Sequence, residues 1–471
     1  MPSFLIVAAV ASLIGDSSSC QKAPGIDARA ELQRAADRTG LTAARGRVVH
    51  TRAFDLTDHA FESDRTYAAP FLAEVSSQDQ WLDVTSGVER VTGQSTVGGY
   101  EFGGTTIGDA RASFAVQDTT VMPSESTHGT LYATRPLSVW AMLGDWLADP
   151  DVHVEGRCTY RDYPRLVLSR NGIAGKERLF IDSKSGYPTK LDRVEPHYLW
   201  GQVHVEFVYS TWERVGSAHL PGGSFRVVDN RTAVTRTFGV RSIVARDGAP
   251  SLAIPASGPM RLALPAFLAP TRPDTVRVSS TTFLLRNRGY TETVTLARDT
   301  VFVFDATQGD ERVRQDSAWI SVLFPGRHPV VLVVTDLAWP HVAGVRAWIA
   351  RGATVVAHRA ARTFLTDVVN RRWTLAPDLL ERRRAGATFR LRTVTDSLRL
   401  AGGDIVLFPI DGAASEVALA AFVRPDRFLW ASDYIQDLTS PTQYLDDVFA
   451  ATERVGVSPV KVAAEHAPLT P

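Results

Sequence analysis

The stretch from Pro329 to Leu365 reads PVVLVVTDLAWPHVAGVRAWIARGATVVAHRAARTFL, and it decides the fold of the chain's second half. Its β-branched run, Val330 to Val334, predicts a buried strand that ends at Thr335-Asp336. A helical pattern follows, breaks at Gly352, and gives way to a second apolar run from Ala353 to Ala357. This order predicts a βαβ unit whose first loop lies at the carboxyl end of a strand, where α/β sheets usually place their chemistry.

The loop after the first strand resembles the metal-binding loop of the metallo-β-lactamase fold superfamily. In that family the loop reads T-H-x-H-x-D-H, followed by a small residue and Gly. Here the same register runs from Thr335 to Gly344 as TDLAWPHVAG. The flanking strands and the Gly match the family, but of the four metal-binding positions only His341 keeps the usual residue.

The remaining segments of the second half occur in the order in which that family is built. Strands are predicted at 276–285, 290–296, 300–304, 404–408, 419–423, 427–430 and 460–465, and helices at 311–323 and 445–455. The resemblance therefore implies an αββα sandwich over residues 275–471.

The family holds two metals, and the first of the two sites has lost its ligands in this sequence. Its matching positions carry Asp336 and Ala338, with Ala414 or Ser415 where a third His is expected. Only Asp336 could bind a metal there, so we expect this first site to be empty.

The second site keeps three of its ligands, although Pro340 replaces the loop Asp. His341, Asp433 and His466 stand at the positions that the resemblance assigns to it. Two imidazoles and a carboxylate with an open position form the composition of a mononuclear catalytic zinc site. The resemblance thus implies one zinc or none, with Asp336 as a candidate general base beside it.

Each of these ligands also has a metal-free interpretation. Asp433 ends a strand in a Ser-Asp-Tyr turn, where its carboxylate could cap a loop. His341 could be an N-terminal residue of a helix, and His466 a core histidine with its hydrogen bonds satisfied. A motif match of this kind needs structural context before it becomes a site.

The first half of the chain reads mainly as strands. Predicted strands lie at 48–50, 66–75, 113–116, 165–169, 176–181, 204–209 and 225–228, and predicted helices at 26–40 and 137–148. The consecutive hairpins between Tyr160 and Asn230, with Asn171-Gly172 and a Leu220-Pro221 strand start, resemble the curved sheets of outer-membrane lipoprotein carriers. That resemblance implies a lipid-like or other small ligand in the concavity, whereas a simple β-meander needs the same turns.

Proline content marks the boundary between the two halves. Gly248 to Asp274 carries six prolines, which exclude a helix or a central strand and indicate a linker. We therefore divide the chain into 1–20, 21–248, 249–274 and 275–471. The predicted fold class is α+β and α/β, a mainly antiparallel β domain followed by the sandwich.

The N-terminal residues predict export. Phe4 to Gly15 is a twelve-residue apolar run that is too short to span a bilayer but suits a secretory signal peptide within 1–20. A buried N-terminal strand or helix is the alternative. Cys20 follows small residues, as in a lipoprotein signal, so it is a candidate lipid anchor in a periplasmic or envelope protein.

The second cysteine, Cys158, has no partner if Cys20 is cleaved off or lipidated, so we expect neither a disulfide framework nor a cysteine zinc site. Lys plus Arg and Asp plus Glu each number 51, and this balance argues against nucleic acid as a partner. No other apolar run approaches 18 residues, so no transmembrane span is expected.

Two functions follow from these observations. In the first, the protein is an exported hydrolase of the metallo-β-lactamase fold that uses at most one metal on an ester, lactam or similar bond. In the second, it is a catalytically inactive relative that binds a ligand or an envelope partner. The oligomeric state is not predicted.

Overall fold

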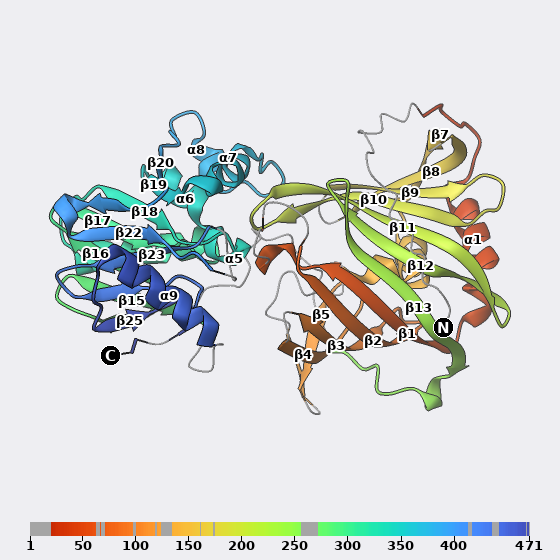
Figure 1. The fold of residues 1–471 in the computed structure, drawn as a ribbon. Coiled ribbons are helices and arrows are strands. Elements are labelled where there is room, and N and C mark those ends of the chain that lie inside the picture. The colour runs from red at the N-terminus through yellow and green to blue at the C-terminus, as the bar shows by residue number, and fades with distance from the viewer. Residues whose placement is uncertain are drawn as a thin grey trace.

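The computed structural model describes residues 20–62, 66, 71–97, 100–117, 120–123, 134–160, 162–172, 175–255, 272–412, 417–435, 442–467 and 469–470. Within them the chain has a mixed α/β structure in which antiparallel strand pairs dominate (Figure 1). The predicted signal peptide up to residue 19, residues 256–271 of the linker, and Ala414 and Ser415 lie outside the described residues.

The first half forms one sheet with the strand order β6-β5-β4-β3-β2-β1-β13-β12-β11-β10-β9-β8-β7, in which the paired strands are antiparallel. Its strands are β1 Arg47–Asp58, β2 Ala73–Asp83, β3 Glu89–Val97, β4 Tyr100–Gly108, β5 Ser113–Gln117, β6 Thr120–Pro123, β7 His153–Tyr160, β8 Tyr163–Gly172, β9 Gly175–Asp182, β10 Pro188–His197, β11 Gly201–Val215, β12 Ala218–Val228 and β13 Arg231–Ala245. The helical segments of this half are α1 Ala28–Thr39, η1 Thr42–Ala44, η2 Ala60–Glu62, η3 Arg135–Leu137, α3 Val139–Ala148 and η4 Arg246–Gly248.

Two helices cover one face of this sheet. Alternation along β11 turns Val205 and Phe207 to that face, where they share a core with Leu32 of α1 and Trp146 of α3. Helix α1 ends at Gly40, whose φ of 83° lets the chain turn away. The predicted helices at 26–40 and 137–148 are therefore confirmed.

The predicted strand at 66–75 is wrong in its described part before Ala73, because Thr66, Phe71 and Leu72 belong to no strand, whereas residues 67–70 lie outside the described residues. The strand in this region is β2, which covers Ala73–Asp83. Its sequence, AEVSSQDQWLD, is mostly polar, and its pattern of burial does not follow a strict alternation. Hydrophobic periodicity therefore gave no signal for it.

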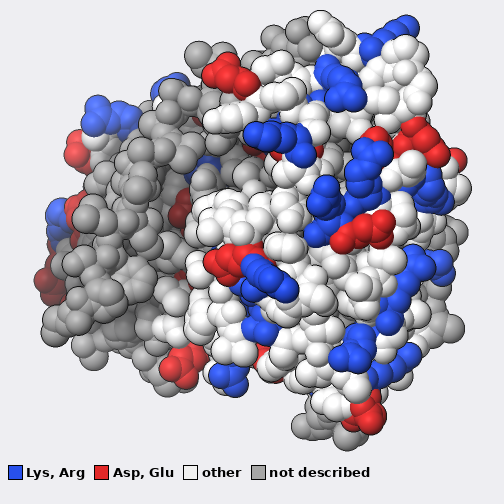
Figure 2. Space-filling view, turned by 90° about the vertical axis from the view of Figure 1, so that its right-hand side faces the viewer, with Lys and Arg blue, Asp and Glu red and all other residues white. Residues whose placement is uncertain are grey.

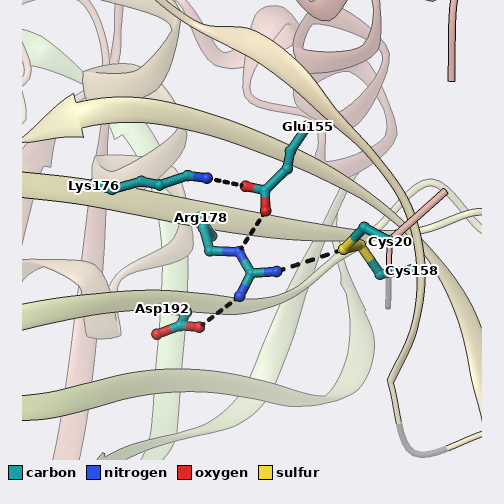
Figure 3. Close-up of a disulfide and its surroundings, with 6 residues drawn as sticks. All are labelled: Cys20, Glu155, Cys158, Lys176, Arg178 and Asp192. Atoms are coloured by element: carbon teal, nitrogen blue, oxygen red, sulfur yellow. Dashed lines mark hydrogen bonds and ion pairs between the residues drawn. A yellow bond between two sulfur atoms is a disulfide. The ribbon is translucent and has the colours of Figure 1, made fainter. Parts of the chain in front are cut away.

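The expectation that the cysteines are unpaired is also wrong, because Cys20 and Cys158 form a disulfide (Figure 3). The bond fixes the start of the described chain to β7, where Gln21 forms a β-bridge with Arg157. Arg178 lies beside the disulfide (Figure 3). Its guanidinium is 3.3 Å from Glu155 and 3.6 Å from Asp192. The expectation failed because it assumed that Cys20 is removed or lipidated.

The second half contains two sheets. One has the order β14-β15-β16-β17-β18-β19-β20, with β17 to β20 parallel, and the other has the order β21-β22-β23-β24-β25. The strands are β14 Asp274–Arg277, β15 Thr282–Asn287, β16 Tyr290–Ala297, β17 Thr300–Phe304, β18 Val330–Val334, β19 Thr354–His358, β20 Leu391–Val394, β21 Leu398–Leu400, β22 Ile405–Pro409, β23 Leu419–Val423, β24 Phe428–Trp430 and β25 Lys461–Ala463. The helical segments are α4 Asp310–Leu323, α5 Trp339–Val342, α6 Val345–Ala350, η5 Arg359–Ala361, α7 Arg362–Asn370, α8 Leu379–Arg383, η6 Ala401–Gly403 and α9 Thr442–Val455.

Three apolar cores define the packing of this half. Side chains of both sheets meet in a shared core that includes Phe304 and Trp430. A second core lies between the seven-stranded sheet and α4, α6 and α7, and a third lies between the five-stranded sheet and α9. The predicted strand Val330–Val334 is confirmed, and the second strand of the βαβ unit runs from Thr354 to His358.

The surface carries charges of both signs. Figure 2 shows Lys and Arg side chains interspersed with Asp and Glu on the face that includes α1 and β7. Among the described residues, no helix combines the length and the apolar character needed to cross a membrane.

Candidate metal centre

The loop that carries His341 begins where β18 ends. Helix α5 starts at Trp339 with Pro340 in its first turn, where a missing N–H costs no helical hydrogen bond. Pro340, where the sequence resemblance led us to expect a metal-binding Asp, therefore lies in the first turn of a helix. Gly344, at the end of the loop, packs closely against Val313 and Ala306. A Cβ at this position would lie 2.6 Å from the Val313 side chain and 3.0 Å from the Ala306 carbonyl.

Asp305 fixes this loop against both sheets. Its carboxylate accepts hydrogen bonds from the Thr335 N–H at 2.7 Å, from the Thr335 hydroxyl, and from the Trp430 indole N–H at 2.9 Å. Thr335 follows β18 in the seven-stranded sheet and Trp430 belongs to β24 in the five-stranded one. Burial, together with the neighbouring charge of Asp336, raises the pKa of Asp305 to about 7.

The structure brings the three predicted metal ligands together. His341, Asp433, His466 and additionally Glu465 each offer one ligand atom, and these four atoms lie within 4.8 Å of one another. Ligands about 2 Å from a tetrahedral zinc are roughly 3.3 Å apart, so the group would need only a modest contraction to hold one ion.

Hydrogen bonds fix the orientation of both imidazoles. Nδ1 of His466 donates to the backbone carbonyl of Gly289 at 2.8 Å. Nδ1 of His341 donates to Asp336 Oδ1 at 3.0 Å and also forms an ion pair with Glu465. Because these acceptors keep the proton on Nδ1, Nε2 of each ring is the nitrogen that can bind a metal.

Buried carboxyl groups shift the pKa values in the interior of the site. Burial raises the pKa of Glu465 well above its usual value, and the positive charge of His341 only partly offsets this effect. Burial opposes the charged form of His341, but Asp336, Glu465 and Asp433 outweigh it and raise the pKa of His341 well above its usual value. The second oxygen of Glu465, Oε1, is buried and has no hydrogen-bond partner among the described residues.

Solvent reaches the site from one side. The side chain of His341 is only 2 % exposed, and that of Glu465 is fully buried. The side chains of Asp433 and His466, by contrast, are 23 % and 26 % exposed, and Asp433 Oδ1 lies 3.5 Å from His466 Nε2. A ligand would therefore approach at the surface made by these two residues.

Asp336, the predicted general base, lies beside this group and contacts His341. Its oxygens accept hydrogen bonds from the Ala338 N–H at 2.7 Å, from His341 Nδ1 and from the Ser432 hydroxyl at 3.2 Å. These contacts make it an orienting partner of His341. Its role as a general base stays a prediction.

Sequence reasoning missed Glu465, although it directly precedes the predicted ligand His466. It was assigned to the last strand, but β25 ends at Ala463, so Glu465 and His466 both lie in the following turn. Because the alternation of a strand is lost there, adjacent side chains can face the same site. A carboxylate next to a predicted metal ligand was the available signal.

A second group, Asp192, His204 and Glu206 on the first sheet, also has ligand atoms within 4.8 Å of one another. It is a weaker candidate for a metal site because cationic side chains already form ion pairs with its carboxylates. Lys190 lies 2.5 Å from Glu206, and Arg178 lies 3.6 Å from Asp192.

Comparison with known proteins gave structural similarity alone. No family model and no curated protein sequence matches the chain. Similar solved structures include the DIM-1 metallo-β-lactamase, with 14 % identity, a TM-score of 0.34, and coverage of 43 % of this chain and 92 % of that chain. A metallo-β-lactamase from Erythrobacter litoralis has 14 % identity, a TM-score of 0.33, and coverage of 42 % and 90 %. The mono-zinc form of FIM-1 from Pseudomonas aeruginosa has 13 % identity, a TM-score of 0.33, and the same coverage as the Erythrobacter protein. Similarity at this level does not extend to the chemistry of the site.

Proposed function

We propose that the chain is a metal-dependent hydrolase of the metallo-β-lactamase type that holds a single metal ion in its second half. The observation that carries the proposal is the convergence of His341, Asp433, Glu465 and His466, whose ligand atoms lie within 4.8 Å of one another. These residues come from three segments of the second half, namely α5, the segment after β24 and the segment after β25, and three of the four match the positions that the sequence resemblance assigned to one metal site.

The donor set fits zinc. Two imidazole nitrogens and carboxylate oxygens are ligands that zinc accepts, and both imidazoles have their Nδ1 fixed by oxygen acceptors, as in known zinc sites. Oε1 of Glu465 is buried without a hydrogen-bond partner among the described residues, and a bound cation would stabilise the charged form of this carboxyl group. When bound, zinc acts as a Lewis acid that activates water or polarises a carbonyl.

The protein's own residues supply orientation and access. Asp336 and Glu465 hold the His341 ring, and Gly289 holds the His466 ring. The partly exposed Asp433 and His466 face the incoming substrate, for which an ester, lactam or similar bond is proposed. The proposed architecture is the αββα sandwich over 275–471, with the β-rich first half as a separate domain.

Export of the protein is part of the proposal. The disulfide between Cys20 and Cys158 supports it, because disulfides persist mainly in oxidising compartments such as the periplasm. A disulfide at Cys20 and a lipid thioether on the same sulfur are mutually exclusive, so the paired state favours a periplasmic protein without an anchor at that residue.

One observation favours the alternative, a catalytically inactive relative. The ion pairs of His341 with Asp336 and Glu465 satisfy its charge without a metal. In that case the imidazolium would replace the cation, and the second half would serve as a scaffold for ligand binding.

Metal content decides between these proposals. The full chain is purified without chelator, and its metals are measured by elemental analysis beside His466→Ala and the control His219→Ala, which lies on β12 in the first half. The hydrolase proposal expects about one zinc per chain in the wild type and the control, and loss of zinc in His466→Ala. Wild-type protein that stays metal-free after incubation with zinc would refute it and leave the inactive scaffold.

A further inference from the structure

The loop that carries His341 is in direct contact with the first half of the chain. The hydroxyl of Thr66 donates a hydrogen bond of 2.8 Å to the backbone carbonyl of Leu337. The indole of Trp339 lies edge-on to Trp200 and His197, with ring centroids 5.5 Å and 5.4 Å away. Both contacts fall within the four residues that precede His341.

The two halves also share an apolar core at this point. Tyr198 and Leu199, at the tip of the β10–β11 hairpin, are buried in one cluster with Leu337, Trp339 and Val342. Figure 1 shows α5 at the junction of the two halves, next to this hairpin. Burial of several apolar side chains across the junction favours a fixed rather than a transient contact.

The tip of the β10–β11 hairpin packs closely against the second half of the chain. The ring nitrogen Nδ1 of His197 accepts hydrogen bonds from the backbone N–H groups of Leu199 and Trp200 at 3.1 Å and 3.2 Å, which holds the turn in shape. Gly201 has a φ of 74°, and a Cβ there would lie 2.4 Å from the Trp373 ring. Only glycine allows the backbone to approach the second half this closely.

Helix α5 depends on such contacts because it is too short to be stable by itself. It has four residues and no side-chain N-cap, whereas isolated helices need about 12 residues or more to form in water. On its other side, the N–H groups of Ala306 and Gln308 donate to the carbonyls of His341 and Pro340, each at 2.9 Å. The helix is therefore held between these carbonyl contacts and the first half.

We propose that the first half of the chain positions the metal ligand His341, with Trp200 and Thr66 as positioning residues. The contacts of Leu337 and Trp339 with the first half fix the start of α5, and α5 in turn fixes the imidazole. The role of His341 as a metal ligand rests on the proposed function. The contact between the first half and the α5 loop, however, can be tested without any metal.

Hydrogen exchange in the full chain, followed by mass spectrometry, measures the order of this loop directly. In Trp200→Ala we expect amide exchange in residues 337–344 to rise about tenfold or more, with exchange in β22 and β23 unchanged. We also expect a roughly tenfold weaker affinity for cobalt(II), used as a spectroscopic probe for zinc. Thr66→Val removes one hydrogen bond and keeps the shape, so it provides a milder second variant if Trp200→Ala does not fold.

The matched control is Gln202→Ala. Gln202 lies on the same hairpin, but the hydrogen bonds that its side chain accepts come from Thr374, which is not part of the α5 loop. Unchanged exchange in 337–344 in both Trp200→Ala and Thr66→Val, or an equal rise in Gln202→Ala, would overturn the proposal. If the wild type binds no metal, the proposed hydrolase fails while the exchange result still decides whether the first half orders this loop.

Discussion

The carbonyl oxygen of Gly289 accepts a hydrogen bond from Nδ1 of His466 over 2.8 Å, so a hairpin turn sets the orientation of a candidate metal ligand. The turn joins β15 to β16 through Arg288 and Gly289, whose φ angles are 49° and 84°. Positive φ at both positions is typical of the two-residue type I′ turn. Tyr290, the next residue, packs edge-on against His466 and His341, with centroid distances of 5.0 Å and 5.8 Å.

The first prediction concerns this turn. Gly289→Ala is expected to lose about 1 kcal/mol of folding stability, because an alanine at this φ is strained although its Cβ has open space. We also expect weaker cobalt(II) binding, since the strained turn displaces the carbonyl that holds His466. Gly289→Asn is the matched control, because Asn tolerates positive φ, and it should retain most of both properties. Urea unfolding and cobalt(II) titration measure the two effects, and equal losses in both variants would contradict the prediction.

The second prediction concerns Glu465. Glu465→Gln keeps the shape of the side chain but removes the charge that pairs with His341, so cobalt(II) affinity should fall about tenfold to a hundredfold. Asp192→Asn is the control, because Asp192 pairs with His204 on the first sheet in the same kind of contact. Its cobalt(II) affinity should equal that of the wild type. An unchanged affinity in Glu465→Gln would mean that this carboxylate neither binds nor orients the metal.

Much of this arrangement could be predicted from the sequence, and the failures have physical causes. The run Val330–Val334 is apolar and β-branched, so it identified a buried strand and the loop after it. Glu465 was missed because the end of β25 cannot be read from periodicity. The contact between Trp200 and Trp339 joins residues far apart in the chain, and no local pattern encodes it. The disulfide was missed because pairing depended on whether Cys20 is retained.

The third prediction tests that disulfide. Protein recovered from an oxidising compartment should show no free thiol until it is unfolded and reduced, because both cysteines are paired. A lipidated Cys20 would instead leave the thiol of Cys158 detectable by a thiol reagent in the unfolded protein. Cys158→Ser should lose about 2–5 kcal/mol of stability in the first half, since the bond links residues 138 positions apart. Reduction of the wild type should reproduce this loss, and it should have no effect on Cys158→Ser.

The last prediction concerns Glu381 of α8 and acid stability. Burial disfavours its charged form, but hydrogen bonds from Arg372 and Arg384 and from the Trp373 N–H outweigh burial and lower the pKa of Glu381 to about 2. Because its pKa is lower in the folded than in the unfolded chain, the unfolded chain binds more protons between about pH 2 and 4.5. The stabilisation from Glu381 is therefore complete above about pH 4.5 and is lost as the pH falls toward 2. Glu381→Gln should be about 1–2 kcal/mol less stable than the wild type at pH 7, and this difference should shrink as the pH is lowered.

The control is Glu311→Gln, at an exposed pair with Arg314, which should change stability by no more than about 0.5 kcal/mol at any of the pH values measured. Denaturant unfolding at pH 7, 5, 4 and 3 measures the difference, and a constant gap between wild type and Glu381→Gln would show that this carboxylate does not titrate in that range.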